Sequence, residues 1–386
     1  MKFRCKKELR NILVLSSAIA GSAIGAIAIP ATLQFNKAPL FARQSAAVAQ
    51  VSADSDDDGG TITYPPVAPP PGVAPLPDRR RREQQEAPGT DYRISDLEAT
   101  YNQTTKDDEL WVGSWRGLAR IDPGSGRILA RVSLPNVTIG ALAEDKMGRL
   151  WVGTYEGLKR VNIRTSEITA QNFLLPSNRI LDLRIDHRGY LWVGTDRGLA
   201  LISPDRGLLM TTLEKLPGVS ANVLTLDMQN HLWAGTLDGL VQIDTASAFV
   251  KKRVTGLPGT LVQALAVWPR AGSVWVGTPK GLFAIDPRSG RLLRKVTTME
   301  GKNVTALSFG EDESIWVGTD NGLFRLNPYN GAIIGEVNNL PSSYIYSLSP
   351  NTDNKLWIGT SQGLVWTSMT SGQVGTHLAF VGPQPR

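Results

Sequence analysis

One nine-residue pattern occurs seven times in this 386-residue chain at nearly constant spacing. It reads apolar-Trp-apolar-Gly-Thr/Ser-x-x-Gly-Leu. The copies begin at Leu110, Leu150, Leu191, Leu232, Val274, Ile315 and Leu356. Their tryptophans lie 40, 41, 41, 42, 41 and 41 residues apart. Because self-similarity at such a period is the signature of a repeat architecture, the repeat constrains the fold more strongly than composition does.

The centre of each repeat predicts a buried strand followed by a tight turn. The segment 191–195, Leu-Trp-Val-Gly-Thr, is too short for a helix and rich in strand-forming residues. The glycine after tryptophan allows a neighbouring chain to approach closely. Thr/Ser-x-x-Gly then predicts a turn whose last glycine has a positive φ.

The flanking residues predict three further strands in each repeat. Gly-Leu opens one of them, as at 281–285, and an Asp-Pro turn at 286–287 leads to another at 291–296. Upstream of each tryptophan, an apolar-x-x-Leu segment such as Ile180 to Leu183 predicts the first, inner strand. Each repeat therefore contains four short antiparallel strands.

Four strands in about 41 residues match one blade of a β-propeller. Seven copies predict an all-β, seven-bladed propeller over residues 92–380, because a closed ring hides the sheet faces that an open array would expose. The first copy begins at its inner strand and the last ends near Phe380 with its outer strand. We therefore expect no strand exchange between the first and last blades, so that packing alone closes the ring.

The motif closely resembles the two-component regulator propeller repeat, whose consensus is Leu-Trp-x-Gly-Thr-x-x-Gly-Leu after an upstream Leu-Pro-x-x-x-Val-x-x-Leu. The matching Leu-Pro pairs are Leu134-Pro135, Leu175-Pro176, Leu216-Pro217, Leu257-Pro258 and Leu340-Pro341. The resemblance covers residues 92–380. In that family the propeller is often the extracytoplasmic sensor of a histidine kinase. It implies here an exported, ligand-binding propeller of the sensor type, without a kinase.

The N-terminal residues 1–49 predict a secretion signal or a signal-anchor helix. Several Lys and Arg side chains precede an apolar run at 12–33, which is long enough for one membrane span of about 20 residues. Ala47-Val48-Ala49 resembles a cleavage site but lies far from that run. A retained anchor and a cleaved signal both stay open, and either one places the propeller outside the cytoplasm, in the periplasm.

Residues 50–91 predict a disordered linker, and residues 381–386 a short tail. The linker is rich in Asp and Pro and contains Arg79-Arg80-Arg81-Arg82, so it cannot form a packed core. The four arginines fit a solvated spacer or a contact with anionic lipid or another anionic partner. Because part of the net charge of +6 lies near the N-terminus, that charge does not point to nucleic acid.

No catalytic, cofactor or metal motif is present in the sequence. Cys5 is the only cysteine, and the three histidines, His187, His231 and His377, lack metal-ligand spacing. We place the first two in hairpins and the third in an outer strand. The Asp145 to Gly148 segment fits a β-turn better than a calcium loop.

The candidate binding site lies on the face that carries the turns after the tryptophan strands and the connections between blades. These positions vary between copies while the framework repeats. Aromatic and arginine side chains gather in one sector, and this combination is typical of binding hot spots. The candidate residues are Arg93, Trp115, Arg116, Tyr155, Arg179, Arg197 and Tyr344. The alternative is a set of ordinary exposed loop residues.

These features favour a binding module for a small molecule, glycan or peptide. The first alternative is an extracytoplasmic scaffold that docks envelope proteins, and the second, less favoured, is a propeller lyase or hydrolase. Carboxylates that converge at the central channel would favour an enzyme, and the acids in the inner strands, Asp96 and Asp182, fall in blades one and three. The membrane is a further partner if the N-terminal segment is retained.

Overall fold

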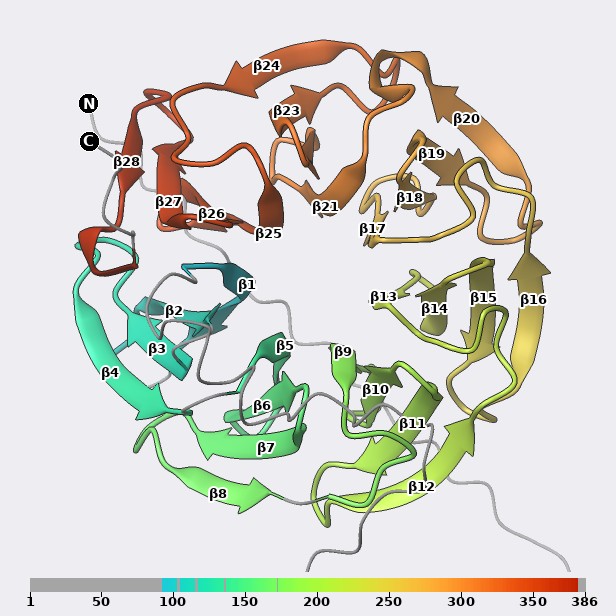
Figure 1. Cartoon of the computed structure of the whole chain (residues 1–386), viewed down its shortest axis with the longest axis horizontal. Helices are drawn as coiled ribbons and strands as arrows, with labels where there is room; N and C mark the ends of the chain where they lie inside the picture. The colour runs from blue at the N-terminus through green and yellow to red at the C-terminus, as the bar shows by residue number, and fades with distance from the viewer. Residues whose placement is uncertain (1–91, 103–104, 115–116, 135–136, 172, 381–386) are drawn as a thin grey trace, which may run out of the picture. The chain divides into compact units, whose positions relative to one another are not determined.

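A computed structural model describes residues 92–380 except 103–104, 115–116, 135–136 and 172. Seven four-stranded antiparallel sheets lie around a central axis (Figure 1). The prediction of an all-β, seven-bladed propeller is therefore confirmed. Contacts divide the chain into residues 1–76 and 77–386, and all described residues belong to the second unit. The predicted signal or anchor region, the linker at 50–91 and the tail at 381–386 lie outside the described residues.

Within each blade the strands follow one another from the inner to the outer edge. Blades one to four contain β1 (Ile94–Tyr101), β2 (Asp108–Ser114), β3 (Gly117–Ile121), β4 (Ile128–Ser133), β5 (Ile139–Glu144), β6 (Arg149–Thr154), β7 (Gly157–Asn162), β8 (Ile168–Gln171), β9 (Ile180–Ile185), β10 (Leu191–Thr195), β11 (Gly198–Ser203), β12 (Leu208–Leu213), β13 (Val223–Leu226), β14 (His231–Thr236), β15 (Gly239–Asp244) and β16 (Val250–Val254).

The remaining three blades repeat this order. They contain β17 (Ala264–Val267), β18 (Val274–Thr278), β19 (Gly281–Ile285), β20 (Leu292–Val296), β21 (Val304–Phe309), β22 (Ile315–Thr319), β23 (Gly322–Leu326), β24 (Ile333–Val337), β25 (Ile345–Thr352), β26 (Lys355–Thr360), β27 (Gly363–Ser368) and β28 (Val374–Thr376). Two short 3-10 helices, η1 (Thr297–Met299) and η2 (Leu378–Phe380), complete the described elements.

The tryptophan strand is the second strand of each blade and is buried on both faces, as predicted. In blade three, Trp192 of β10 pairs with Arg184 of β9 and with Leu201 of β11. All five residues of β10 are buried. Because both sheet faces must be covered, the apolar clusters lie between blades. One cluster joins Trp151 of blade two to Ile180 and Val193 of blade three.

The glycine after each tryptophan sets how closely two blades approach. A Cβ at Gly153 would lie 2.5 Å from Cγ2 of Ile180, the first residue of the next inner strand. The same relationship joins Gly113 to Ile139, Gly277 to Val304, Gly318 to Ile345 and Gly359 to Ile94, and Gly235 faces Val262, two residues before β17. Gly194 differs, since it faces the carbonyl of Ala221. The predicted close approach at these glycines is thus confirmed.

Hairpin aspartates fix the tryptophans of three consecutive blades. Trp Nε1 donates to an aspartate at 2.8 Å for Trp151–Asp145, 3.2 Å for Trp192–Asp186 and 3.0 Å for Trp233–Asp227. Each aspartate also accepts backbone N–H groups of its own hairpin. These bonds join each hairpin carboxylate to its own turn and to the tryptophan of its blade.

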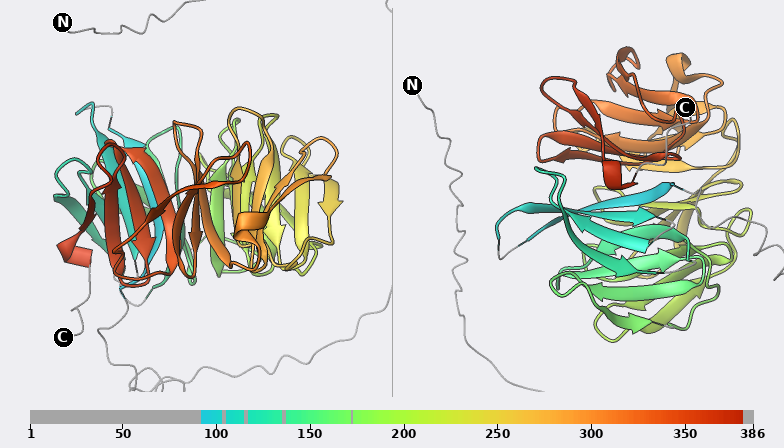
Figure 2. Two further views of the ribbon diagram at one scale, coloured as in Figure 1. Left: turned by 90° about the horizontal axis from the view of Figure 1, so that it is seen from above. Right: turned by 60° about the vertical axis from the view of Figure 1, so that its left-hand side comes forward.

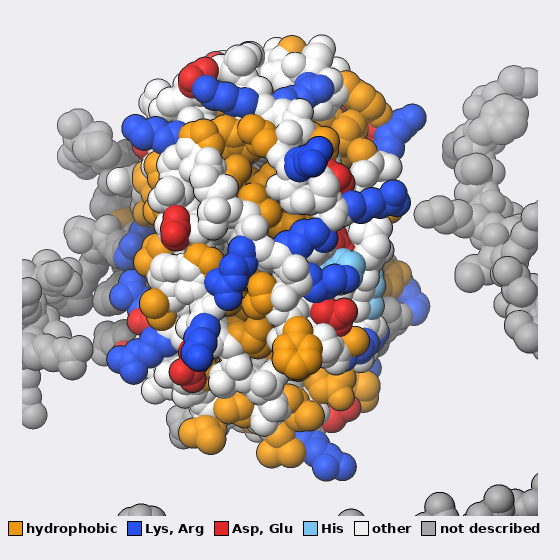
Figure 3. Space-filling view, turned by 90° about the vertical axis from the view of Figure 1, so that its right-hand side faces the viewer, with side chains coloured by type: hydrophobic (Ala, Val, Ile, Leu, Met, Phe, Trp, Pro, Cys, Tyr) orange, Lys and Arg blue, Asp and Glu red, His pale blue; other side chains and the backbone are white. Residues whose placement is uncertain are grey.

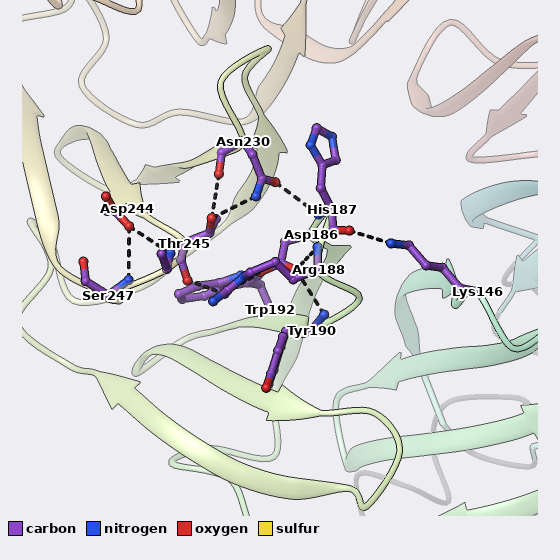
Figure 4. A network of polar contacts seen from close by, with 11 residues as sticks. Lys146, Asp186, His187, Arg188, Tyr190, Trp192, Asn230, Asp244, Thr245 and Ser247 are labelled. Carbon is purple, nitrogen blue, oxygen red and sulfur yellow. Dashed lines mark hydrogen bonds and ion pairs between the residues drawn. The ribbon is translucent and has the colours of Figure 1, made fainter. Parts of the chain in front are cut away.

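Polar contacts join the same hairpins across blades two, three and four (Figure 4). Lys146 Nζ donates to the His187 carbonyl at 2.5 Å, and the His187 N–H donates to Asn230 Oδ1 at 3.1 Å. Arg188 donates to the Thr245 carbonyl and lies 4.9 Å from the Tyr190 ring. These bonds use the backbone of His187, which lies in its predicted hairpin.

The ring closes by packing between blades one and seven, as predicted, because among residues 92–380 no strand is exchanged between their sheets. The end of the chain differs from the prediction in detail. Phe380 belongs to η2, and His377 follows β28, so neither lies in the outer strand. His377 Nε2 lies 2.5 Å from the Gly126 carbonyl, and Arg131 covers the Phe380 ring at 5.5 Å. The chain leaves the blade seven sheet early because its last residues pack on blade one.

Candidate functional site

The turns after the tryptophan strands and the connections between blades share one face, here called the upper face. Seen from the side, the loops of the ring gather on two opposite faces (Figure 2). Backbone bonds tie each turn to the residue that precedes its inner strand, as from Tyr155 N to Thr138 O at 3.0 Å and from Ser361 N to Tyr344 O at 3.2 Å. The predicted grouping of these positions on one face follows from this pairing.

Tyr155 and Arg179 form an aromatic–guanidinium pair on the upper face. The Arg179 guanidinium carbon lies 4.6 Å from the Tyr155 ring centroid. Tyr155 is 41% exposed, and Arg179 is exposed as well. The two residues belong to blades two and three. A Cβ at Gly140, which lines the central cavity, would lie 3.5 Å from Tyr155 Cε1, so the pair borders the channel.

The other predicted residues are more dispersed. The Tyr344 and Tyr346 rings are tilted by 33° with centroids 4.6 Å apart. Burial, followed by the neighbouring Tyr346 and Asp320, raises the pKa of Tyr344. Arg93 and Arg197 are exposed. Within the described part of the chain, the Arg197 side chain makes no hydrogen bond or ion pair. Trp115 and Arg116 lie outside the described residues, so their role stays a prediction.

The central channel holds a polar cavity of about 340 Å³, which sequence reasoning did not locate. Asp96, Glu98, Asp182 and Arg184 line its wall. Asp96 and Asp182 come from blades one and three, which are not adjacent, yet they share this cavity. The only signal in the sequence was an acid two residues after the first apolar residue of an inner strand.

The channel carboxylates hold neighbouring blades together. Asp96 Oδ1 accepts from Leu97 N at 2.9 Å, and Asp182 Oδ1 accepts from Leu183 N at 2.7 Å. The second oxygen of each carboxylate accepts a backbone N–H from the next blade. Every carboxylate oxygen of this pair therefore has a donor in the inner strands.

Burial also changes the acidity of the channel carboxyls. It raises the pKa of Asp96 to about 8, with the negative charges of Asp182 and Glu98 adding to the effect. Burial likewise raises the pKa of Glu98 and of Asp182, while Arg184 opposes both shifts. Carboxyls with raised pKa values cluster at functional sites and also in structural networks.

No group of three or more His, Cys, Asp or Glu side chains within the described ranges is arranged to hold a metal ion. His231 begins β14 rather than lying in a hairpin, and its ring lies 3.1 Å from Asp227 and 2.8 Å from Lys251.

No helix among the described residues is long and apolar enough to cross a membrane.

The repeat family is confirmed by comparison with known proteins. The family model described as Two component regulator propeller matches residues 133–156, 174–197 and 339–362. These three segments are therefore matched as two component regulator propeller repeats. Each matched segment ends in the turn after a tryptophan strand, in blades two, three and seven. No curated protein matches the chain by sequence similarity.

Solved structures share the fold. The extracellular domain of BT4673 from B. thetaiotaomicron, named as a one component system, matches with a TM-score of 0.62 and 18% identity over 72% of this chain and 38% of that chain. The extracellular domain of BT3049 from the same organism, named as a hybrid two component system, matches with a TM-score of 0.58 and 20% identity over 71% of this chain and 39% of that chain. The WD40 propeller domain of Doa1 matches with a TM-score of 0.60 and 15% identity, over 72% of this chain and 93% of that chain. This chain thus spans about two fifths of the first two solved extracellular domains.

Proposed function

We propose that this chain is an extracytoplasmic binding module that recognises a small molecule, glycan or peptide on its upper face, as a sensor-type propeller. The observation that carries this proposal is the exposed pair of Tyr155 and Arg179 beside the channel. Neither side chain covers the apolar clusters between blades. The pair is therefore available to a ligand without loss of packing.

The chemistry of the pair suits ligands that combine a flat or apolar face with an acceptor group. A tyrosine ring packs against sugar or peptide surfaces, and a guanidinium donates in a planar fork to carboxylate or phosphate oxygens. Tyr344 and Tyr346 add aromatic surface at the same end of the channel. Trp115 and Arg116, which lie outside the described residues, stay predicted members of the site.

The location outside the cytoplasm is part of the same proposal. It is supported by the apolar run at 12–33 with its basic flank, which can be cleaved or retained as an anchor. It is also supported by the matched propellers of BT4673 and BT3049, which are extracellular domains. The ligand of a sensor head would then reach the upper face from the surrounding medium.

One observation favours a second candidate, a lyase or hydrolase. Asp96 and Asp182 share a cavity of about 340 Å³, within the size range of small-ligand pockets, and both carboxyls have raised pKa values. Against it, both oxygens of each carboxylate already accept backbone N–H bonds. A substrate would have to displace bonds that join blades.

The test is ligand capture by the full chain from glycan, peptide and metabolite panels. Tyr155→Ala and Arg179→Ala should each weaken capture by about tenfold, and Arg179→Lys should restore only part of it. Arg206→Ala removes an exposed arginine from the opposite face and serves as the matched control. Unchanged capture by folded Tyr155→Ala and Arg179→Ala proteins would remove this site. Turnover of a captured compound that Asp96→Asn abolishes would favour the enzyme instead.

A further inference from the structure

The outer rim of blades four and five is unusually basic. Its outer strands β16 and β20, with the residue before β20, carry Lys251, Lys252, Arg253, Arg291, Arg294 and Lys295. Residues 249–256 and 287–299 contain no acidic residue. By contrast, the outer strands β8, β12, β24 and β28 contain no Lys or Arg. The positive charge is therefore concentrated on one side of the ring.

Most of this charge is not neutralised within the ring. Lys251 Nζ contacts His231 at 2.8 Å, Lys252 Nζ donates to Gln242 at 3.0 Å, and Arg253 donates to a backbone carbonyl at 3.2 Å. Among the described residues, Lys295 alone of the six forms an ion pair, with Glu300. Five of the six cations thus form no ion pair among the described residues.

Large apolar side chains project from the same rim. Phe249 is 74% exposed immediately before β16, and Leu293 is 61% exposed in β20 beside the exposed Leu292. Figure 3 shows hydrophobic side chains interleaved with Lys and Arg over this side of the molecule. Exposed apolar groups among cations are typical of surfaces that enter the interface of a membrane.

We propose that the rim formed by Phe249, β16, Leu292 and Leu293 docks on an anionic phospholipid bilayer. The cations would contact the head groups, and the Phe and Leu side chains would enter the interface between head groups and acyl chains. A groove of about 800 Å³ borders Phe249 between blades three and four. A peptide in that groove would leave Leu292 and Leu293 uncovered, because both lie in blade five, whereas a bilayer covers both blades.

The test measures the fluorescence of a label attached to the rim of the full chain. With Cys5→Ser, an environment-sensitive fluorophore is attached at Ala246→Cys, in the turn before β16. The control label is at Arg164→Cys, the matching position of the turn before β8 in blade two. The probes are vesicles of phosphatidylcholine alone and of phosphatidylcholine with 30% phosphatidylglycerol. Because each label reports its own surroundings, anchoring through the N-terminal segment does not by itself give a positive result.

The rim label should shift to shorter wavelength and be quenched by brominated lipid with anionic vesicles only, while the blade two label stays unchanged. Removing one cation should weaken the response about fivefold. Lys251→Glu with Arg253→Glu should abolish it, Lys251→Arg should retain it, and Leu292→Ser with Leu293→Ser should reduce quenching. No response to anionic vesicles, or equal responses at both labels, overturns the proposal. The proposal is also overturned if the rim label responds to an acidic peptide of residues 54–60 but not to vesicles. The rim would then be a binding surface for the acidic segment of this chain.

Discussion

Asp96 Oδ2 accepts the backbone N–H of Leu142 at 2.6 Å, so a side chain of blade one fastens the inner strand of blade two. Asp182 repeats the arrangement with Leu224 N of blade four at 2.5 Å. Both carboxylates face the channel, near Glu98 and Arg184. A protonated carboxyl keeps an acceptor oxygen, so the bonds to Leu142 N and Leu224 N survive protonation. Ionisation of Asp96 and Asp182, by contrast, places two negative charges in the same small cavity.

The first prediction concerns pH and Asp96. Burial, with the charges of Asp182 and Glu98, raises its pKa from 3.8 to about 8. Since the folded pKa lies above the unfolded value, the stability that Asp96 contributes is complete below about pH 4 and is lost as the pH rises to about 8. Asp96→Asn cannot ionise. The stability of the variant relative to the parent should therefore rise between about pH 4 and about pH 8 and stay constant above about pH 8. The measurement is urea unfolding of both proteins at a series of pH values.

Asp205→Asn is the control for this experiment, because the Asp205 carboxylate is 78% exposed. Its stability difference from the parent should not grow in the same pH range. The raised pKa of Asp96 would be contradicted if the stability difference between Asp96→Asn and the parent did not change with pH. It would also be contradicted if the parent became the more stable protein as the pH rose.

The second prediction tests the tryptophan that fills the boundary between blades. Trp192 is fully buried and donates to Asp186 at 3.2 Å. Trp192→Ala should lower the free energy of unfolding by about 3–5 kcal/mol, because the cavity cannot collapse between two sheets. Met147→Ala, at an exposed site, should change it by less than about 0.5 kcal/mol. A loss under about 1 kcal/mol for Trp192→Ala would mean that the ring repacks around the missing indole.

The third prediction addresses the close approach that completes the ring. A Cβ at Gly359 would lie 2.7 Å from the Ile94 carbonyl oxygen. Gly359→Ala should therefore destabilise the protein by about 1–3 kcal/mol through overpacking. Gly335→Ala is the matched control, since its nearest neighbour would lie at an ordinary 3.7 Å. Equal thermal unfolding of the two variants would show that the boundary of blades seven and one is loose.

The fourth prediction concerns the last turn of the described chain. Phe380 is 8% exposed and lies in the cluster that joins blades one and seven, whereas Leu378 of the same turn is 88% exposed. Phe380→Ala should cost about 3 kcal/mol, and Leu378→Ala should cost almost nothing. The measurement is denaturant unfolding of both variants. Similar small losses would mean that η2 does not take part in closure.

The fold could be predicted from the sequence because its information is local and repeated. The turn glycines are an example. Gly198, Gly239 and Gly281 have φ values of +119°, +95° and +136°, so only glycine fits the turn without strain. The end of blade seven could not be predicted equally well. The residues before Phe380 were predicted to form an outer strand, but β28 ends at Thr376. His377 then contacts Gly126, and Arg131 covers Phe380, so the last residues pack on blade one.

The candidate site was only partly accessible to sequence reasoning. Tyr155 lies in the turn after the tryptophan strand of blade two, and Arg179 lies just before the inner strand of blade three. The repeat places both kinds of position on one face, so their sector could be predicted from the period. Asp96 and Asp182 are 86 residues apart, from the difference of their numbers, and no sequence pattern relates the side chains of two non-adjacent blades. Their shared cavity depends on the narrow centre of the ring, which is a property of the assembled blades.

Tyr92 and Phe380, the two ends of the described chain, line one cavity of about 370 Å³. Every blade between them is built from consecutive residues. The boundary between blades one and seven is therefore closed in the same way as the other boundaries, by packing alone. A circular permutant that joins these ends through a short linker and opens the chain at another connection should therefore reach the same ring. Such rearranged chains offer a way to move the attachment point of the linker relative to the upper face.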